Sequence, residues 1–118
     1  MNIEAFRELC LAQKASEETF PFDEVTLVFK VMGKMFALLP LDEEVPRANL
    51  KADPEWSEEL RECHPQIIPG WHMNKKHWNT VYLEDGLEDD LIKQMIIHSY
   101  EQVIKKLPLK SKKALQEW

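Results

Sequence analysis

The segment VTLVFKVMGKMFALL, residues 25–39, carries the clearest secondary-structure signal in the chain. Over residues 25–31, apolar side chains recur at every second position, which is the period of a strand that buries one face. Met32 and Gly33 follow as a two-residue turn, and residues 34–39 supply a returning strand. Strands joined by so short a turn are antiparallel. The segment therefore predicts a β-hairpin within an antiparallel sheet.

The chain on either side of the hairpin predicts two helices and a third strand. Residues 3–14 place apolar side chains at helical spacing after Asn2, a residue type that caps helices well. After the hairpin, an acidic connection leads to a short strand at residues 47–51. Asp53-Pro54-Glu55 then starts a second helix, because a capping carboxylate followed by proline is a strong helix N-terminus. The first half therefore predicts a β-meander between two helices.

The second half of the chain predicts a further strand and two more helices. Residues 78–83 alternate as a strand after a mixed extended segment at residues 67–72. A long helix over residues 88–107 has acids at its positive end, lysines at its negative end and one apolar face. Residues 110–118 can form a short terminal helix. This order predicts an α+β fold: an antiparallel sheet, made of a β-meander plus additional strands, with helices packed on it.

Length and composition favour one globular domain. The chain has 118 residues, of which 44% are apolar, and no internal repeat or Gly/Ser linker divides it. We therefore treat residues 1–118 as a single domain. No apolar run approaches the roughly 18 residues of a membrane helix, and the N-terminus lacks the pattern of a signal peptide. We expect a cytoplasmic protein that makes no membrane contact and acts as a monomer.

The two cysteines predict no disulfide. Cys10 and Cys63 lie far apart in the sequence, and each falls on the apolar stripe of a predicted helix. A free cysteine at such a position behaves as a small hydrophobic residue. In a reducing compartment we expect both thiols to remain free.

The usual signatures of enzymes and metal sites are absent from the sequence. It contains no phosphate-binding glycine loop, no Gly-x-Ser-x-Gly, no Cys-x-x-Cys and no His-Glu-x-x-His. His64, His72 and His77 form the densest group of histidines, but their spacing does not match the paired ligands of a zinc site. We expect no catalytic activity, no cofactor and no metal site.

Residues 70–80, GWHMNKKHWNT, have the most unusual composition in the chain. They combine tryptophans, histidines, lysines and asparagines, which together can stack on bases, neutralise phosphates and hydrogen-bond base edges. The alternative is structural: Trp71 and Trp78 belong to the core while Lys75 and Lys76 decorate a turn. The sequence alone leaves both interpretations open.

Several blocks of the chain resemble, in order, those of the MmcQ/YjbR family of small bacterial proteins. The blocks are Phe20–Asp23, Leu27–Val31, Gly33–Ala37, Asn49–Lys51, Gly70–Leu83 and His98-Ser99-Tyr100. The resemblance implies a frataxin-like or double-wing α+β fold. It also implies a non-enzymatic role in DNA binding, with no catalytic residues to transfer. The wing-like strands and the segment from Met73 to Asn79 would form the contact surface.

The candidate DNA-contacting residues follow from this resemblance and from the basic residues of the segment. They are Lys34, His72, Asn74, Lys75, Lys76, His77 and Asn79. The net charge of −6 opposes a protein that coats nucleic acid, but the acidity is concentrated in residues 1–63. Residues 105–113 contain five lysines and no acid. The sequence therefore predicts DNA contact through a basic and aromatic edge.

Two other functions remain open at this stage. The Trp/His/Asn surface around residues 71–80 could serve a protein-interaction or small-ligand-binding module. The frataxin likeness adds an acidic ridge that handles iron. We rank the iron hypothesis last, because the carboxylates are scattered over predicted loops and helix ends.

Overall fold

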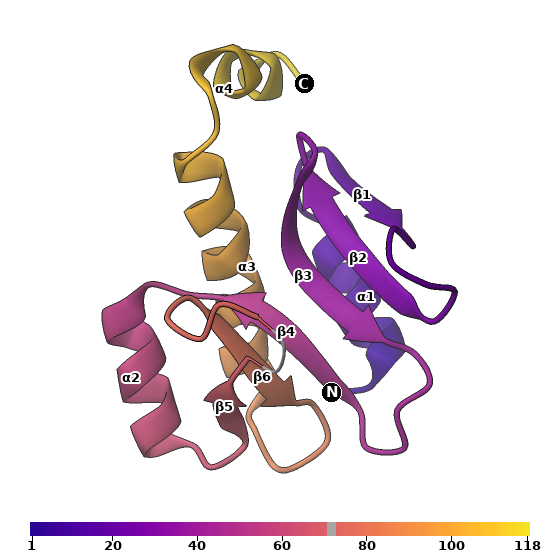
Figure 1. The fold of residues 1–118 in the computed structure, drawn as a ribbon, viewed down its shortest axis with the longest axis vertical. Helices are drawn as coiled ribbons and strands as arrows, with labels where there is room; N and C mark the ends of the chain where they lie inside the picture. The colour runs from indigo at the N-terminus through magenta and orange to yellow at the C-terminus, as the bar shows by residue number, and fades with distance from the viewer. Residues whose placement is uncertain (71–72) are drawn as a thin grey trace.

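A computed structural model describes residues 1–70 and 73–118 of the chain. Its elements are α1 (Ile3–Leu11), β1 (Ser16–Thr19), β2 (Thr26–Val31), β3 (Lys34–Pro40), β4 (Arg47–Lys51), α2 (Pro54–Cys63), β5 (Ile67–Pro69), β6 (Trp78–Tyr82), α3 (Asp89–Lys105) and α4 (Leu109–Gln116) (Figure 1). The described strands form one sheet of order β1-β2-β3-β4-β6-β5, and every neighbouring pair is antiparallel. The predicted α+β fold with an antiparallel sheet is confirmed.

The predicted hairpin is formed by β2 and β3. Its register pairs Thr26 with Pro40 and Val31 with Lys34, so Met32 and Gly33 form the turn as expected. Both turn residues have positive φ, +49° and +80°, which is the backbone of a turn whose twist matches the flanking strands. Glycine adopts this conformation without steric cost, which explains its place in the turn.

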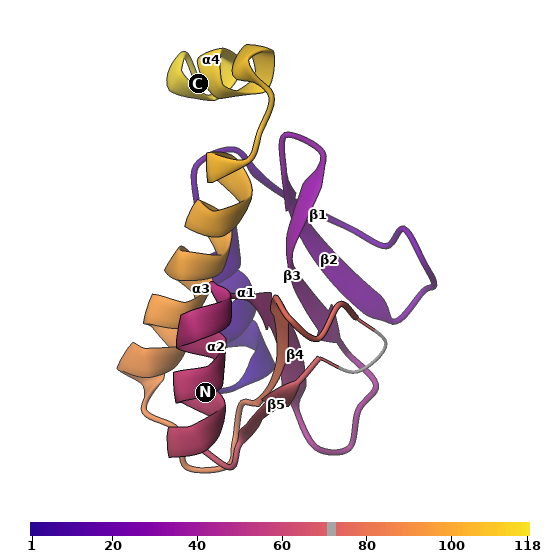
Figure 2. The same ribbon diagram turned by 60° about the vertical axis from the view of Figure 1, so that its left-hand side comes forward.

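Helices α1, α2 and α3 cover one face of the sheet, and no helix within residues 1–70 and 73–118 packs on the other face. α1, α2 and α3 lie on the same side of the strands (Figure 2), and α3 packs across β3 and β4. The main core lies between these layers and includes Phe29, Phe36 and Ile96, each fully buried. On the opposite face, Val28, Leu38 and Trp78 form a smaller buried cluster against the partly buried Met35 and Met73. We call this second side the open face.

The sheet consists of two three-stranded halves with a narrow junction. β3 and β4 pair only through Ala37 with Leu50 and Leu38 with Asn49, so β1-β2-β3 and β4-β6-β5 diverge on both sides of this contact. One buried side chain of α3 bridges the halves where the pairing ends. The Ser99 hydroxyl accepts a hydrogen bond from the Lys51 amide and donates one to the Phe36 carbonyl. This hydroxyl replaces a direct bond between the two strands.

The structure differs from the prediction at the end of the first helix. α1 ends at Leu11 instead of residue 14, and Ala15 has a φ of +60°, which turns the chain toward the sheet. The following residues 16–19 form β1, an edge strand paired with β2 that the sequence pattern did not predict. Its sequence, Ser-Glu-Glu-Thr, has no apolar alternation. None of these four residues is buried, so the strand needs no apolar face.

Cys63 is exposed, which corrects the prediction that it lies on a buried stripe. The buried face of α2 is rotated toward Ser57 and Arg61, whose side chains hydrogen-bond the sheet residue Asn79. Cys63 therefore lies outside the contact between α2 and the sheet. Cys10 is buried as expected, and burial raises the pKa of its thiol.

The long helix α3 and the short helix α4 follow the prediction closely. α3 covers Asp89–Lys105, and α4 covers Leu109–Gln116 beyond its C-terminal end (Figure 1). Of the helices in the described ranges, none is long and apolar enough to cross a membrane.

Candidate functional site

A pocket of about 290 Å³ opens where β3 and β4 diverge, next to the bridge made by Ser99. Its lining comes from the hairpin, β4, β6 and the C-terminal end of α3: Lys34, Met35, Lys51, Trp78, Val103 and Lys106. Half of these side chains are apolar and half are cationic, and none of them is acidic. We call this site the cationic pocket.

Within the cationic pocket, Lys106 lies close enough to Lys51 to influence it. Lys51 is half-buried, and burial together with the positive charge of Lys106 lowers the pKa of its ammonium group. Within residues 1–70 and 73–118, no ion pair engages Lys34, Lys51 or Lys106. Such unneutralised charge around a concave surface attracts anions, and an ammonium group is a strong hydrogen-bond donor to phosphate.

His77 lies at the rim of this pocket. Burial lowers its pKa first, and the charges of Lys106, Lys51 and Lys76 lower it further, whereas Asp53 opposes the shift. These lysines belong to three different parts of the chain, and the fold brings all three near the His77 ring. Burial first, and the neighbouring lysines second, therefore disfavour the protonated form of this imidazole.

The turn that carries Lys76 and His77 is anchored from helix α2. The Arg61 guanidinium donates hydrogen bonds to the carbonyls of Lys75 and Trp78, one at each end of the turn. Within the turn, the Asn74 side chain accepts a bond from the Lys76 amide at 3.0 Å. Arg61 and Asn74 thus fix the backbone, while the exposed Lys76 side chain remains at the surface.

Close packing before the turn also restricts its path. Gly70 donates its amide to the Trp78 carbonyl at 2.8 Å, and a Cβ atom at this position would lie 2.9 Å from the Cβ of Trp78. Only glycine allows the two chain segments to approach so closely. The Lys75 ammonium also donates to the Gly70 carbonyl, at 3.0 Å, so this lysine holds the base of the turn.

The structure brings some of the predicted contact residues together. Lys34 lines the cationic pocket, and Lys76 and His77 lie beside it. Asn74 is exposed but uses its side-chain oxygen within the turn. His72 and the nearby Trp71 lie outside the described residues.

Asn79 is not a surface residue, which corrects its place among the predicted contacts. It is fully buried; its Oδ1 accepts from Arg61 at 2.7 Å and its Nδ2 donates to Ser57 at 3.0 Å. Both ends of the amide are therefore occupied inside the protein. Trp78 is 7% exposed and packs against Val28, as the structural interpretation of this tryptophan predicted.

The sequence did not indicate Lys51 or Arg61, and it indicated Lys106 only as one of the five lysines of residues 105–113. Lys51 ends a predicted strand and Arg61 lies on a charged helix, so neither position is unusual by composition. Asn49-Leu50-Lys51 was one of the blocks quoted for the family resemblance, and this was the only available signal for Lys51.

Each residue of the block His98-Ser99-Tyr100 makes a contact that stabilises the fold. His98 Nε2 accepts a hydrogen bond from the Asp53 amide, and its ring packs edge-on against Trp56 with centroids 4.5 Å apart. Ser99 bridges the two halves of the sheet. The Tyr100 hydroxyl donates to the Lys14 carbonyl at 2.7 Å. The block therefore secures the fold around the cationic pocket without lining it.

Acidic and metal-binding side chains do not form a comparable site. Among the residues that the structure describes, no group of three or more His, Cys, Asp or Glu side chains is arranged to hold a metal ion. Another described cavity, lined by Glu8, Asp89 and Asp90, also contains Lys93 and the N-terminal residue, whereas the charged side chains that line the cationic pocket are all lysines.

The chain is similar in sequence and structure to several bacterial proteins. The chain is 35% identical over 115 residues to the uncharacterized protein YjbR of Escherichia coli strain K12, covering 98% of each chain. The crystal structure of Deinococcus radiodurans protein DR2400, described with the domain DUF419, has a TM-score of 0.89 and 43% identity. That match covers 98% of this chain and 88% of the other. A protein from Pseudomonas syringae has a TM-score of 0.75 and 29% identity, covering 86% and 98% of the two chains.

The similarity extends to a family model. The model of the YjbR family matches residues 11–102, which include both halves of the sheet and most of α3. Together with the nearly full-length match to the E. coli protein, this shows that the chain belongs to the YjbR family.

Proposed function

We propose that the protein is a non-enzymatic DNA-binding protein that contacts the phosphate backbone through the cationic pocket and the adjoining turn. The observation that carries this proposal is the convergence of Lys34, Lys51 and Lys106, with Lys76 and His77 at the rim. These residues come from four separate segments of the chain. Their charges favour a ligand that carries several negative charges close together.

The pocket supports backbone contact more than base recognition. Ammonium groups interact with phosphates at any base sequence, whereas base recognition needs side chains that are free to pair with base edges. The two asparagines of the turn segment, Asn74 and Asn79, use their side chains within the protein. We therefore propose binding with little sequence preference.

The net charge of −6 restricts the contact to one edge of the molecule. DNA approaching any acidic surface is repelled, so the cationic pocket also orients the encounter. In this proposal the two halves of the sheet act as the two wings that the double-wing likeness implies. The protein binds as a monomer, which sedimentation of the free protein and of its DNA complex can test.

Fluorescence anisotropy with a labelled duplex, measured over a series of salt concentrations, tests the proposal. The double variant Lys34→Glu/Lys106→Glu should lose about tenfold or more in affinity and show a smaller salt slope, because fewer counterions are released. A matched control is Lys110→Glu/Lys113→Glu, which makes the same charge change at exposed positions of α4. The control should lose less affinity.

Two results would contradict the proposal. One is the absence of salt-dependent binding by the unmodified protein to any duplex or single strand near physiological salt. The other is an equal loss of affinity in the two double variants, since net charge alone would then explain the binding.

A further inference from the structure

A second cavity lies on the open face at the opposite end of β4 from the cationic pocket. Its volume is about 550 Å³, within the range typical of small-molecule sites. The lining is Phe22, Thr26, Leu38, Pro40, Arg47, Ala48, Asn49, Met73 and Thr80. We call this cavity the sheet groove. It combines an apolar surface with a few polar side chains, as sites for small organic ligands do.

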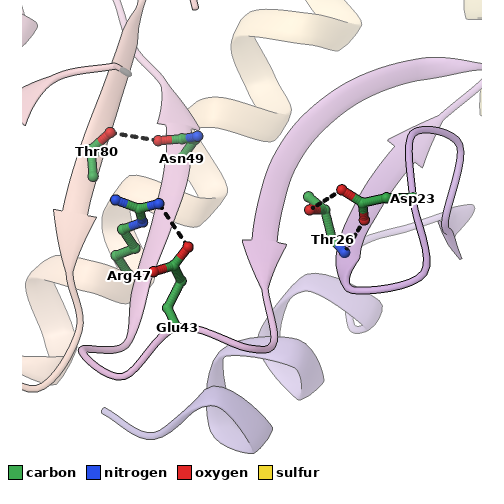
Figure 3. Close-up of polar contacts among 6 residues, drawn as sticks. All are labelled: Asp23, Thr26, Glu43, Arg47, Asn49 and Thr80. Atoms are coloured by element: carbon green, nitrogen blue, oxygen red, sulfur yellow. Dashed lines mark hydrogen bonds and ion pairs between the residues drawn. The ribbon is translucent and has the colours of Figure 1, made fainter. Parts of the chain in front are cut away.

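The polar groups on the β4 and β6 side present hydrogen-bond donors. The Thr80 hydroxyl donates to Asn49 Oδ1 at 2.7 Å, and the two side chains point toward one another (Figure 3). This bond fixes the orientation of the Asn49 amide and leaves its NH₂ group to donate elsewhere. Arg47 lies beside them in the same view, and its guanidinium donates to Glu43 at 2.9 Å.

The Arg47 ion pair lies at the surface and can be exchanged. The side chains of Arg47 and Glu43 are 28% and 37% exposed, and pairs of this kind add little to stability. A carboxylate ligand can therefore take the place of Glu43 at the Arg47 guanidinium.

The acid on the opposite wall is already engaged by the backbone. Asp23 accepts hydrogen bonds from the Thr26 amide and hydroxyl (Figure 3) and from the amide of Val25. These bonds, those to the Val25 and Thr26 amides above all, lower the pKa of Asp23. The Asp23 carboxylate thus holds Thr26, which lines the groove, in place. Arg47 and Asn49 remain the groups that select the polar end of a ligand.

We propose that the sheet groove binds a small carboxylic acid with an apolar or aromatic body. The carboxylate accepts hydrogen bonds from the Asn49 amide and the Arg47 guanidinium, a pairing that is charge-assisted. The body of the ligand lies on the apolar surface of Leu38, Pro40 and Met73. This site does not depend on the DNA-binding proposal, since the lysines of the cationic pocket take no part in it.

NMR titration of the ¹⁵N-labelled protein with 3-phenylpropionate tests the site. The expected result is saturable shifts of the Asn49 side-chain NH₂ and of the amides of Met73 and Thr80. The neutral analogue 3-phenylpropionamide has the same body and serves as the control ligand. It should bind about tenfold more weakly, because it lacks the charge that Arg47 recognises.

Two substitutions should change the affinity in opposite directions. Asn49→Asp keeps the oxygen that accepts from Thr80 but replaces the donor by a negative charge, so 3-phenylpropionate should bind at least about tenfold more weakly. Glu43→Gln removes the internal competitor for Arg47 at an exposed position and should tighten binding about threefold. The inference is overturned if 3-phenylpropionate causes no saturable shifts in the groove. It is also overturned if its neutral analogue binds equally well, or if both variants bind like the unmodified protein.

Discussion

The cationic pocket and the sheet groove lie on the two sides of the same narrow junction between β3 and β4. In the pocket, Lys34, Lys51 and Lys106 surround an apolar floor without an acidic neighbour in the lining. In the groove, Arg47, the cation among the described lining residues, is paired with Glu43. The divergence of the two strands creates both cavities, and the side chains decide their ligands. The lysines of the pocket have no acidic neighbour in its lining and favour a ligand with several negative charges. In the groove, Glu43 offsets the charge of Arg47 and Thr80 orients the Asn49 amide, which favours one small anion.

The strongest test removes the element that both cavities share. Ser99→Ala deletes the hydroxyl that joins the Lys51 amide to the Phe36 carbonyl and leaves both buried groups without this partner. We expect a loss of about 2–3 kcal/mol in the free energy of unfolding, measured with urea. Affinity for DNA and for 3-phenylpropionate should fall together, since the junction positions both sites.

Ser111→Ala is the matched control for this substitution. Ser111 lies in α4, outside the sheet, and its replacement should change stability by less than about 0.5 kcal/mol. If Ser99→Ala is no more destabilising than Ser111→Ala, the bridge does not hold the two halves together.

The next test affects the two cavities unequally. Arg61→Met removes the anchor of the turn at residues 74–77 and the donor to the buried Asn79 oxygen. Stability should fall by about 1–3 kcal/mol, because a buried acceptor loses its partner. DNA affinity should fall more than affinity for 3-phenylpropionate, since the turn carries Lys76 and His77.

Hydrogen exchange of the turn amides provides the direct measurement for Arg61. Exchange at residues 75–78 should accelerate in Arg61→Met and also in Arg61→Lys, because a single ammonium cannot reproduce the several bonds of the guanidinium. Unchanged exchange at these amides in both variants would contradict the role assigned to Arg61.

The hairpin and the two longer helices could be predicted because each depends on local signals. The alternation in residues 25–31, the turn at Met32 and Gly33, and the proline start of α2 are encoded within a few neighbouring residues. Strand β1 could not be found in this way. It forms because Ala15 redirects the chain and because β2 offers an unpaired edge.

The candidate site was less predictable than the fold because its residues are distant in sequence. Lys34, Lys51 and Lys106 meet only after β3, β4 and α3 have packed. The basic run around Lys75 did indicate one part of the site. It could not show that Asn79 faces Ser57 and Arg61 in the interior, since alternation in a strand does not reveal which face a helix covers.

The pH dependence of DNA binding gives a smaller effect that is specific to the cationic pocket. His77 has a lowered pKa, caused by burial and then by Lys106, Lys51 and Lys76. As pH falls, the unfolded chain therefore takes up this proton at the ordinary histidine pKa, before the folded protein does, and the free protein loses stability from there down to the lowered pKa. A bound phosphate offsets the lysine charges and raises the pKa, so DNA binding takes up a proton.

Affinity for DNA should consequently rise a few-fold as the pH falls below about 6.5, between the lowered pKa of His77 in the free protein and its higher pKa in the complex. His77→Gln should abolish this rise while leaving the affinity at the alkaline end nearly unchanged. Anisotropy titrations at constant ionic strength measure both effects. A rise of the same size in His77→Gln would show that another group takes up the proton.

The smallest expected effect concerns the acid that distinguishes the two cavities. Glu43→Gln removes the carboxylate partner of Arg47 and should change stability by less than about 0.5 kcal/mol, because the pair is exposed. DNA affinity and its salt slope should stay within about twofold of the unmodified protein, since Arg47 lies at the far end of β4 from Lys51 and salt screens the exposed charge. If the salt slope instead increases by as much as Lys34→Glu/Lys106→Glu decreases it, DNA must contact Arg47 as well. The pocket and the groove would then be two parts of one polyanion-binding surface, and Glu43 would be the residue that limits its extent.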